Sequence, residues 1–300
     1  MKSRHPERVQ RADGAPASSR VIKLGGSLLD DAQRRDTVLR EIARAWHRGE
    51  QLVIVHGGGK HIDAALATRG IARKTHAGLR ITDDVTLEIV IDVLDHVVNP
   101  LIVNELLALG VNAEGISGAS ILIAEKHPPI DGIDLLNVGR VIGANTIECS
   151  DTLPVISCVA AHNGAPASAG HGGAPLLNVN ADSAAAAVAV AMKADSLQFI
   201  TDVAGLLDEN GAVVSSLHAN AVEEWIDNVT GGMKPKLQAA LHALQNGVSP
   251  ITIGCHPELV EGSGRPGGTL LTANFAAPHT RPGASLTLGV TNEGEPNVAA

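Results

Sequence analysis

The chain has 300 residues, a formal charge of −9 and only 1% aromatic residues, with no tyrosine. This acidic balance argues against a nucleic-acid partner, because basic and aromatic side chains are what hold a nucleic acid. The longest apolar run, residues 184–192, is too short to cross a bilayer, so we expect no membrane partner.

The cysteines and the chain ends bear on where the protein works. Cys149, Cys158 and Cys255 are odd in number and form no CxxC pair, which is typical of free thiols in a reducing compartment and predicts a cytoplasmic protein. Residues 1–19 are polar without an apolar centre, so we expect a disordered leader rather than a secretory signal. Residues 274–300 are expected to form a flexible tail.

Strand and helix patterns alternate along the first half of the chain. We expect strands over 20–24 and 52–55, each followed by a helix, over 32–47 and 61–69 respectively. The second strand is apolar without alternation, as in a parallel sheet that is buried on both faces. The amphipathic segment 84–109 is expected to kink or break at Asn99-Pro100.

The second half continues the alternation. Strands are expected over 121–124, 137–144, 153–157, 197–201 and 251–254, with a hairpin at 208–211 and helices that follow Asp182 and Gly232. The stretch 161–175, rich in Gly, Ala and Pro, is expected to be a loop or a poor hairpin that divides the chain into lobes 20–175 and 176–273. The pattern predicts an α/β protein, a three-layer αβα sandwich around a mostly parallel sheet.

Three glycine turns are candidate anion sites. Gly25-Gly26 follows the first strand, Gly57-Gly58-Gly59 follows the second, and Gly231-Gly232 precedes a helix. Bare backbone N–H groups at such turns bind anions, and parallel strands bring their turns to one edge of the sheet. A tight turn needs only one glycine, so three in a row favour a ligand. The spacing fits neither a dinucleotide fingerprint nor a Walker A loop.

Four charged residues accompany these turns, and each has two readings. Lys23 lies in an apolar strand and needs either an anion or a route to solvent. Lys236, in the first turn of a helix, opposes the helix dipole unless it shares an anion or is solvated. Asp182 is either a helix N-cap or a counter-ion, and Arg80 is either an exposed loop cation or a clamp for a carboxylate.

Five motifs together suggest a family. They are Val21–Ser27, Val55–Lys60, Gly78–Asp83, Asn178–Asp182 and Gly231–Lys236. In residues, order and spacing, the chain resembles the acetylglutamate kinase branch of the amino acid kinase family over residues 20–272. The Gly-Leu-Arg-Ile-Thr and Asn-Val-Asn-Ala-Asp motifs are the specific ones, whereas the Gly-Gly turns belong to the wider family.

The resemblance implies transfer of the γ-phosphoryl group of ATP to the side-chain carboxylate of N-acetyl-L-glutamate, the second step of arginine biosynthesis. It implies that Lys23 and Lys236 grip the transferred group and that Asp182 holds both lysines. The substrate-binding residues implied are Gly57, Gly58, Gly59, Arg80, Asn178 and Asn180. Those implied for the nucleotide are Lys23, Gly25, Gly26, Thr201, Asp202, Val203, Leu206, Leu207, Gly232, Met233 and Lys236. Mg²⁺ would be held chiefly by phosphates and water.

The resemblance also bears on the oligomeric state and on two alternative functions. It implies a homodimer whose N-terminal lobe binds the acyl amino acid and forms the dimer contact, while the C-terminal lobe binds the nucleotide. Ser120 stands where relatives commonly carry an aspartate. A kinase of the same branch that acts on carrier-linked aminoadipate is one alternative. A non-catalytic amino-acid or nucleotide sensor is the other, and it would be favoured had Lys23, Asp182 or Lys236 been lost.

Overall fold

The computed structural model describes residues 18–147, 151–163, 175–229, 231–255 and 268–273. The tail expected over 274–300 lies outside these ranges, as do most of the leader and residues 164–174 of the low-complexity stretch. Ser19, which we expected in the leader, is instead the first residue of a buried strand. Within the described ranges, no helix is long and apolar enough to cross a bilayer.

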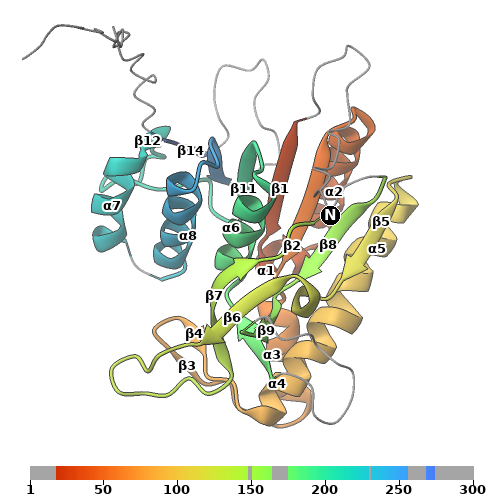
Figure 1. Cartoon of the computed structure of the whole chain (residues 1–300), viewed down its shortest axis with the longest axis vertical. Helices are drawn as coiled ribbons and strands as arrows, with labels where there is room; N and C mark the ends of the chain where they lie inside the picture. Colours follow the sequence, from red (N-terminus) through yellow and green to blue (C-terminus); the bar gives the residue numbers. More distant parts are fainter. Residues whose placement is uncertain (1–17, 148–150, 164–174, 230, 256–267, 274–300) are drawn as a thin grey trace, which may run out of the picture.

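One eight-stranded sheet forms the centre of the molecule (Figure 1). Its strands, in spatial order, are β12 (Ser216–His218), β14 (Thr269–Thr272), β13 (Ile251–Gly254), β11 (Ser196–Ile200), β1 (Ser19–Leu24), β2 (Gln51–His56), β8 (Leu153–Ser157) and β5 (Ala113–Ile116). Among the described strands of this sheet, only β13 and β14 pair antiparallel. The expected mostly parallel α/β sheet is confirmed.

Helices cover both faces of this sheet. The α-helices of the described residues are α1 (Gly26–Asp30), α2 (Ala32–His47), α3 (Gly59–Thr68), α4 (Asp84–Ile91), α5 (Asn99–Ala108), α6 (Ala181–Met192), α7 (Ala219–Asn228) and α8 (Met233–Gln245). Helices α2 and α5 pack on one another, and α6 packs on α8 and on strands β1, β2 and β11. Strands β1 and β2 are almost wholly buried, because side chains from both helical layers cover them.

A second, smaller group of strands lies at one end of the large sheet (Figure 1). Strands β6 (Leu122–Lys126), β7 (Val138–Ala144), β9 (Val159–His162) and β10 (Leu176–Val179) form a closed ring, and β3 (Thr75–His76) and β4 (Leu79–Arg80) form a hairpin. Strands β9 and β10 pair antiparallel and so flank the low-complexity stretch as a hairpin would. The division into two lobes stays a prediction, because the large sheet joins strands from both.

The long segment that begins at Asp84 does not break at Pro100. A π-helix, η1 (Asp92–Val98), follows α4 directly and leads into α5. Proline lacks an N–H and crowds the carbonyl four residues earlier, so the wider turn ahead of Pro100 lets the helix continue. The π-helix also places Asn99, the first residue of α5, in the buried interior.

Candidate active site

Three buried charged side chains meet at one atom. The Nζ atoms of Lys23 and Lys236 each lie 2.9 Å from the same oxygen, Oδ1 of Asp182. Lys23, Asp182 and Lys236 are only 8%, 6% and 5% exposed. They come from β1, α6 and α8, so the fold brings together three residues that are far apart in the chain.

The cluster carries one positive charge more than negative. Burial alone would raise the pKa of Asp182, but the two ammonium groups outweigh it and hold this pKa below its usual value. Burial, followed by the charge of Lys23, lowers the pKa of Lys236, although Asp182 opposes this shift. A buried excess of positive charge is costly without an anion, so the cluster is suited to bind one.

Asp182 is free to hold the lysines because it does not cap its own helix. The N-cap of α6 is Asn180, whose side-chain oxygen accepts from the N–H groups of Asp182 and Ser183 at 2.8 and 3.1 Å. The N-cap reading of Asp182 was therefore wrong. Asn180 fixes the first turn of α6, and through this turn the direction of the Asp182 side chain.

Two of the glycine turns touch beside this cluster. A Cβ atom added to Gly25 would lie 3.9 Å from Lys23 Nζ and 2.9 Å from the Ile200 carbonyl oxygen. A Cβ atom on Gly26 would lie 3.2 Å from the Gly59 nitrogen. Helices α1 and α3 start at these turns without a side-chain cap, and α8 has none either. Their first N–H groups can therefore serve a bound anion.

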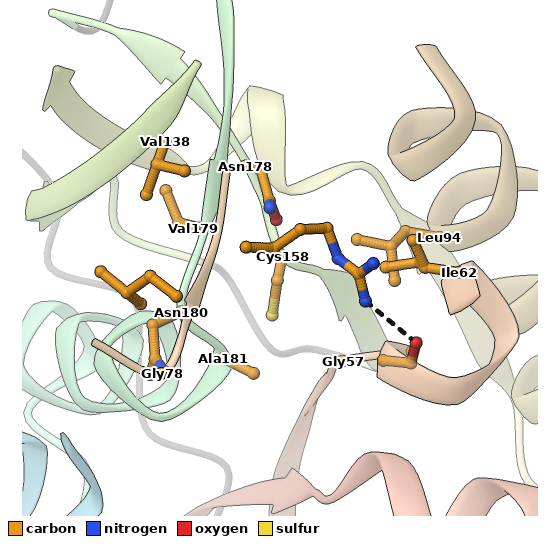
Figure 2. A pocket seen from close by; sticks show the side chains of 14 residues that line it. Gly57, Ile62, Gly78, Leu94, Val138, Cys158, Asn178, Val179, Asn180 and Ala181 are labelled. Carbon is orange, nitrogen blue, oxygen red and sulfur yellow. Dashed lines mark hydrogen bonds between the residues drawn. The ribbon is translucent and has the colours of Figure 1, made fainter. Parts of the chain in front are cut away.

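A cavity of about 180 Å³ opens at the second glycine turn. Figure 2 shows Val138 and Val179 on one side of it and Ile62 and Leu94 on the other. The Asn178 side chain is among the few polar groups in its lining. Apolar walls with a few placed polar groups are typical of a site for a small organic ligand.

Arg80 supplies the positive charge of this cavity. Its Nη2 forms an ion pair with Asp63 at 2.5 Å and donates to the Gly59 carbonyl at 3.2 Å (dashed line in Figure 2). Its Nη1 is buried and has no hydrogen-bond partner among the described residues. A buried guanidinium N–H without an acceptor is unfavourable, so Arg80 is placed to receive a carboxylate. Asn178 lies nearby on β10 and donates to Thr82 Oγ1 at 3.0 Å.

Comparison with known proteins identifies the family. The model of the amino acid kinase family matches residues 19–255. The chain belongs to the amino acid kinase family. It is 39% identical over 242 residues to a protein named acetylglutamate kinase from Solibacter usitatus (strain Ellin6076), which covers 78% of this chain and 89% of the relative. An acetylglutamate kinase from Ruegeria pomeroyi (strain ATCC 700808 / DSM 15171 / DSS-3) is 37% identical over 254 residues, with 82% and 83% covered.

Solved structures agree with this membership. The crystal structure of smu.665 from Streptococcus mutans UA159 superposes with a TM-score of 0.70 at 30% identity, covering 85% of this chain and 98% of that one. The N-acetylglutamate synthase from Neisseria gonorrhoeae, solved with coenzyme A and N-acetyl-glutamate, gives a TM-score of 0.71 at 21% identity, covering 85% of this chain and 59% of that one. This second likeness extends to the amino acid kinase fold alone.

Five of the residues that the family resemblance implies for the nucleotide, Thr201, Asp202, Val203, Leu206 and Leu207, follow strand β11. Thr201 is buried and donates from Oγ1 to Asp202 Oδ1 at 3.1 Å, and the Leu206 N–H donates to Thr269 Oγ1 at 2.8 Å. Val203 and Leu207 are 39% and 49% exposed. Gly232 and Met233 lie at the start of α8, the helix that carries Lys236.

The described residues contain no group of three or more acidic, histidine or cysteine side chains that could hold a metal ion. At the lysine cluster the carboxylate of Asp182 already contacts two ammonium groups. This donor set does not form a protein-held metal site. It is compatible with Mg²⁺ that arrives on a nucleotide, because Mg²⁺ keeps several waters and takes phosphate oxygens.

Several cavity residues were missed by the sequence analysis. Cys158 directly follows β8, the neighbour of β2, so the rule that ligands bind at the carboxyl edge of a parallel sheet could have found it. Ile62, Leu94 and Val138 carry no signal of their own, because apolar residues at these spacings are indistinguishable from core. Asp63, the partner of Arg80, has no sequence signal either.

Proposed function

We propose that this chain is an ATP-dependent kinase that phosphorylates the side-chain carboxylate of N-acetyl-L-glutamate, the second step of arginine biosynthesis. The observation that carries the proposal is the buried contact of Lys23 and Lys236 with one oxygen of Asp182, beside two touching glycine turns. The names of the curated relatives support the choice of acceptor.

The two lysines act on the transferred group. Phosphoryl transfer needs placement and charge neutralisation more than covalent help, and the charge to be neutralised lies on the phosphoryl oxygens. Lys23 and Lys236 approach from different elements, so they can contact that group from two sides. Asp182 keeps both ammonium groups in place without cancelling both charges. Removing either lysine should cost on the order of 10²-fold or more in turnover.

The acceptor occupies the cavity at the second glycine turn. Its reacting carboxylate accepts from the backbone N–H groups of Gly58 and Gly59, because the Gly57 N–H donates to the Leu24 carbonyl at 3.5 Å. Its α-carboxylate accepts from Arg80 and Asn178. The apolar walls receive the acyl group and the methylene chain. Asn180 acts indirectly, since its side chain is engaged in capping α6.

The nucleotide lies on the other side of the lysine cluster. The Gly26 N–H faces its phosphates, whereas the Gly25 N–H already donates to the Ile200 carbonyl at 3.0 Å, so Gly25 gives close backbone approach and no donor. Residues 201–207 with Gly232 and Met233 receive the base and ribose. The exposed apolar side chains of Val203 and Leu207 offer contact to a flat base. Mg²⁺, held by phosphates and water, would neutralise phosphate charge when bound.

The remaining assignments complete the proposal. Residues 20–175 form the lobe that binds the acyl amino acid and makes the contact of a homodimer, and residues 176–273 form the nucleotide lobe. The protein works in the cytoplasm, where ATP is available and where cysteines stay reduced.

A coupled ADP-release assay tests the function. Purified protein with Mg²⁺·ATP is offered N-acetylglutamate, glutamate, aspartate and aminoadipate in separate reactions, and we expect ADP release only with N-acetylglutamate. Arg80→Met should raise the KM for this acceptor by on the order of 10- to 100-fold, because a charge-assisted hydrogen bond is lost.

Arg73→Met is the matched control. Arg73 also pairs with Asp63, at 2.9 Å, but its side chain is 57% exposed, and Arg73 does not line the cavity. We expect its kinetics to stay close to those of the unmodified protein. Equal activity with all four acceptors, or none with N-acetylglutamate, would refute the proposed acceptor.

A further inference from the structure

A fully buried histidine lies directly behind the acceptor turn. His56 is the last residue of β2, is 0% exposed and precedes Gly57. Its Nδ1 lies 3.1 Å from the Gly57 carbonyl oxygen, and its Nε2 lies 3.1 Å from Asn99 Nδ2. The same Asn99 nitrogen donates to the Val155 carbonyl at 2.8 Å. None of these side chains has a part in the proposed chemistry.

The contacts of Asn99 determine where His56 carries its proton. The Val155 carbonyl can only accept, so the Asn99 atom that faces it must be the amide nitrogen and not the amide oxygen. That NH₂ group donates its second hydrogen toward His56 Nε2, which must therefore be the unprotonated nitrogen. The proton of the neutral ring then sits on Nδ1 and is donated to the Gly57 carbonyl.

The ring stays neutral at ordinary pH. Burial lowers the pKa of His56 to about 4, against a weaker opposing effect of the Gly57 carbonyl and Asp95. A neutral ring with one fixed N–H can donate in one direction only.

The bond to the Gly57 carbonyl orients a peptide plane. In a trans peptide the carbonyl and the following N–H point in opposite directions. Because the Gly57 oxygen is turned toward His56 in the core, the Gly58 N–H is turned away from it, toward the cavity that both glycines line. Among the described residues, the Gly58 N–H has no hydrogen-bond acceptor.

Neighbouring groups hold the same turn from other sides. A Cβ atom on Gly58 would lie 2.8 Å from Leu94 Cδ2 and 3.2 Å from Val98 Cγ2, both in the π-helix that ends directly before Asn99. The Cys158 thiol donates to the His56 carbonyl at 2.8 Å. The π-helix thus packs its side chains against Gly58, and the residue that follows it, Asn99, carries the amide that fixes the His56 ring.

We propose that His56, locked by Asn99 with its proton on Nδ1, is a positioning residue that aims the Gly58 N–H at the reacting carboxylate of the acceptor. The inference rests on the proposed function in so far as the acceptor binds at this turn. It explains why a histidine that never touches substrate occupies the end of β2. It also gives the π-helix a part in building the site.

Two substitutions of His56 test the roles of its two ring nitrogens separately. The amide of asparagine is two bonds from Cβ, like Nδ1, and the amide of glutamine is three bonds away, like Nε2. His56→Asn therefore keeps a donor for the Gly57 carbonyl and loses the partner of Asn99, whereas His56→Gln does the reverse. Each variant leaves one old partner unpaired, so both should lose comparable thermal stability.

We expect His56→Asn to keep most of the kcat/KM for the acceptor and His56→Gln to lose on the order of 10²-fold, as when a preorganised donor is lost. The KM for ATP should stay unchanged in both, because the nucleotide side is untouched. Equal loss in the two variants, or no loss in either, would overturn the inference.

A spectroscopic measurement on the unmodified protein tests the same point without any variant needing to be active. In ¹⁵N-histidine spectra, assigned with the help of His56→Gln or Asn99→Leu, we expect His56 to be protonated on Nδ1 and to remain neutral at pH 6. A proton on Nε2 contradicts the inference. If the unmodified protein releases no ADP with any acceptor, the proposed function fails, while this spectrum still decides the orientation of the ring.

Discussion

Replacement of Lys236 by methionine separates the charge of the lysine cluster from its packing. Methionine fills a similar volume in the buried first turn of α8, next to Phe199, whose ring centre lies 5.3 Å from the Lys236 Nζ. Asp182 keeps its ion pair with Lys23 at 2.9 Å. The cluster therefore passes from one net positive charge to none, and no charge is left without a partner.

The effect on stability can be worked from the distances. At an effective dielectric constant of about 20, an ion pair at 2.9 Å is attractive by roughly 6 kcal/mol. The two ammonium groups contact one oxygen, so they are at most twice this distance apart and repel by roughly 3 kcal/mol or more. The second lysine thus gains at most about 3 kcal/mol, which the desolvation of a buried ion offsets.

We therefore expect the free energy of unfolding of Lys236→Met, measured by urea titration, to lie within about 1 kcal/mol of that of the unmodified protein. The kcat of this variant should nevertheless fall by on the order of 10²-fold or more. Asp182→Asn is the contrasting variant, since it leaves two buried ammonium groups facing a neutral amide and should cost about 3–5 kcal/mol. A Lys236→Met protein that is destabilised by more than about 3 kcal/mol, or that keeps near-normal turnover, would refute the reasoning.

Three further outcomes follow from other contacts. The pKa of Lys236 is lowered, first by burial, so the unfolded chain binds more protons at this residue than the folded protein does below pH 10.5. The free energy of unfolding should therefore gain a contribution from Lys236 that rises from neutral pH toward 10.5, and this rise should be absent in Lys236→Met. If the difference in free energy of unfolding between the two proteins does not change with pH, the expectation is contradicted. Asn180→Ala should lose about 1 kcal/mol and much of the turnover, whereas Asp31→Ala, which removes the cap of α2, should lose similar stability with normal kinetics. Gly58→Ala should cost about 1–3 kcal/mol and raise the acceptor KM, because its Cβ meets Leu94, whereas Gly143→Ala, with nothing within 4 Å of the added Cβ, should do neither.

The architecture was predictable because it rests on local patterns. Unbroken apolar runs such as that before His56 predict strands buried on both faces, and their alternation with amphipathic segments predicts a parallel sheet between helices. The helix over 32–47 and the strand over 153–157 have the predicted bounds. The segment after Asp84 was harder, since nothing in a proline signal distinguishes a broken helix from one that widens into a π-turn.

Some residues of the candidate site could likewise be predicted from local patterns, and others could not. Lys23 and Lys236 stood out because a cation in a buried strand or at a helix start violates a local rule. Asp182 did not, because its position two residues after Asn180 is as suitable for a cap as for a counter-ion. Only the observed bonds from the α6 amides to Asn180 separate the two roles.

The sequence by itself determined the alternation of strands and helices, the glycine turns at their ends and the residues that carry charge, since each of these depends on a few neighbours in the chain. The tertiary structure decided which of them meet. The convergence of Lys23 and Lys236 on one oxygen and the fixing of the His56 proton by Asn99 and the Val155 carbonyl join segments that only the packed sheet brings within hydrogen-bond distance. Long-range contacts of this kind depend on how whole layers pack, and no local pattern in the chain encodes that packing.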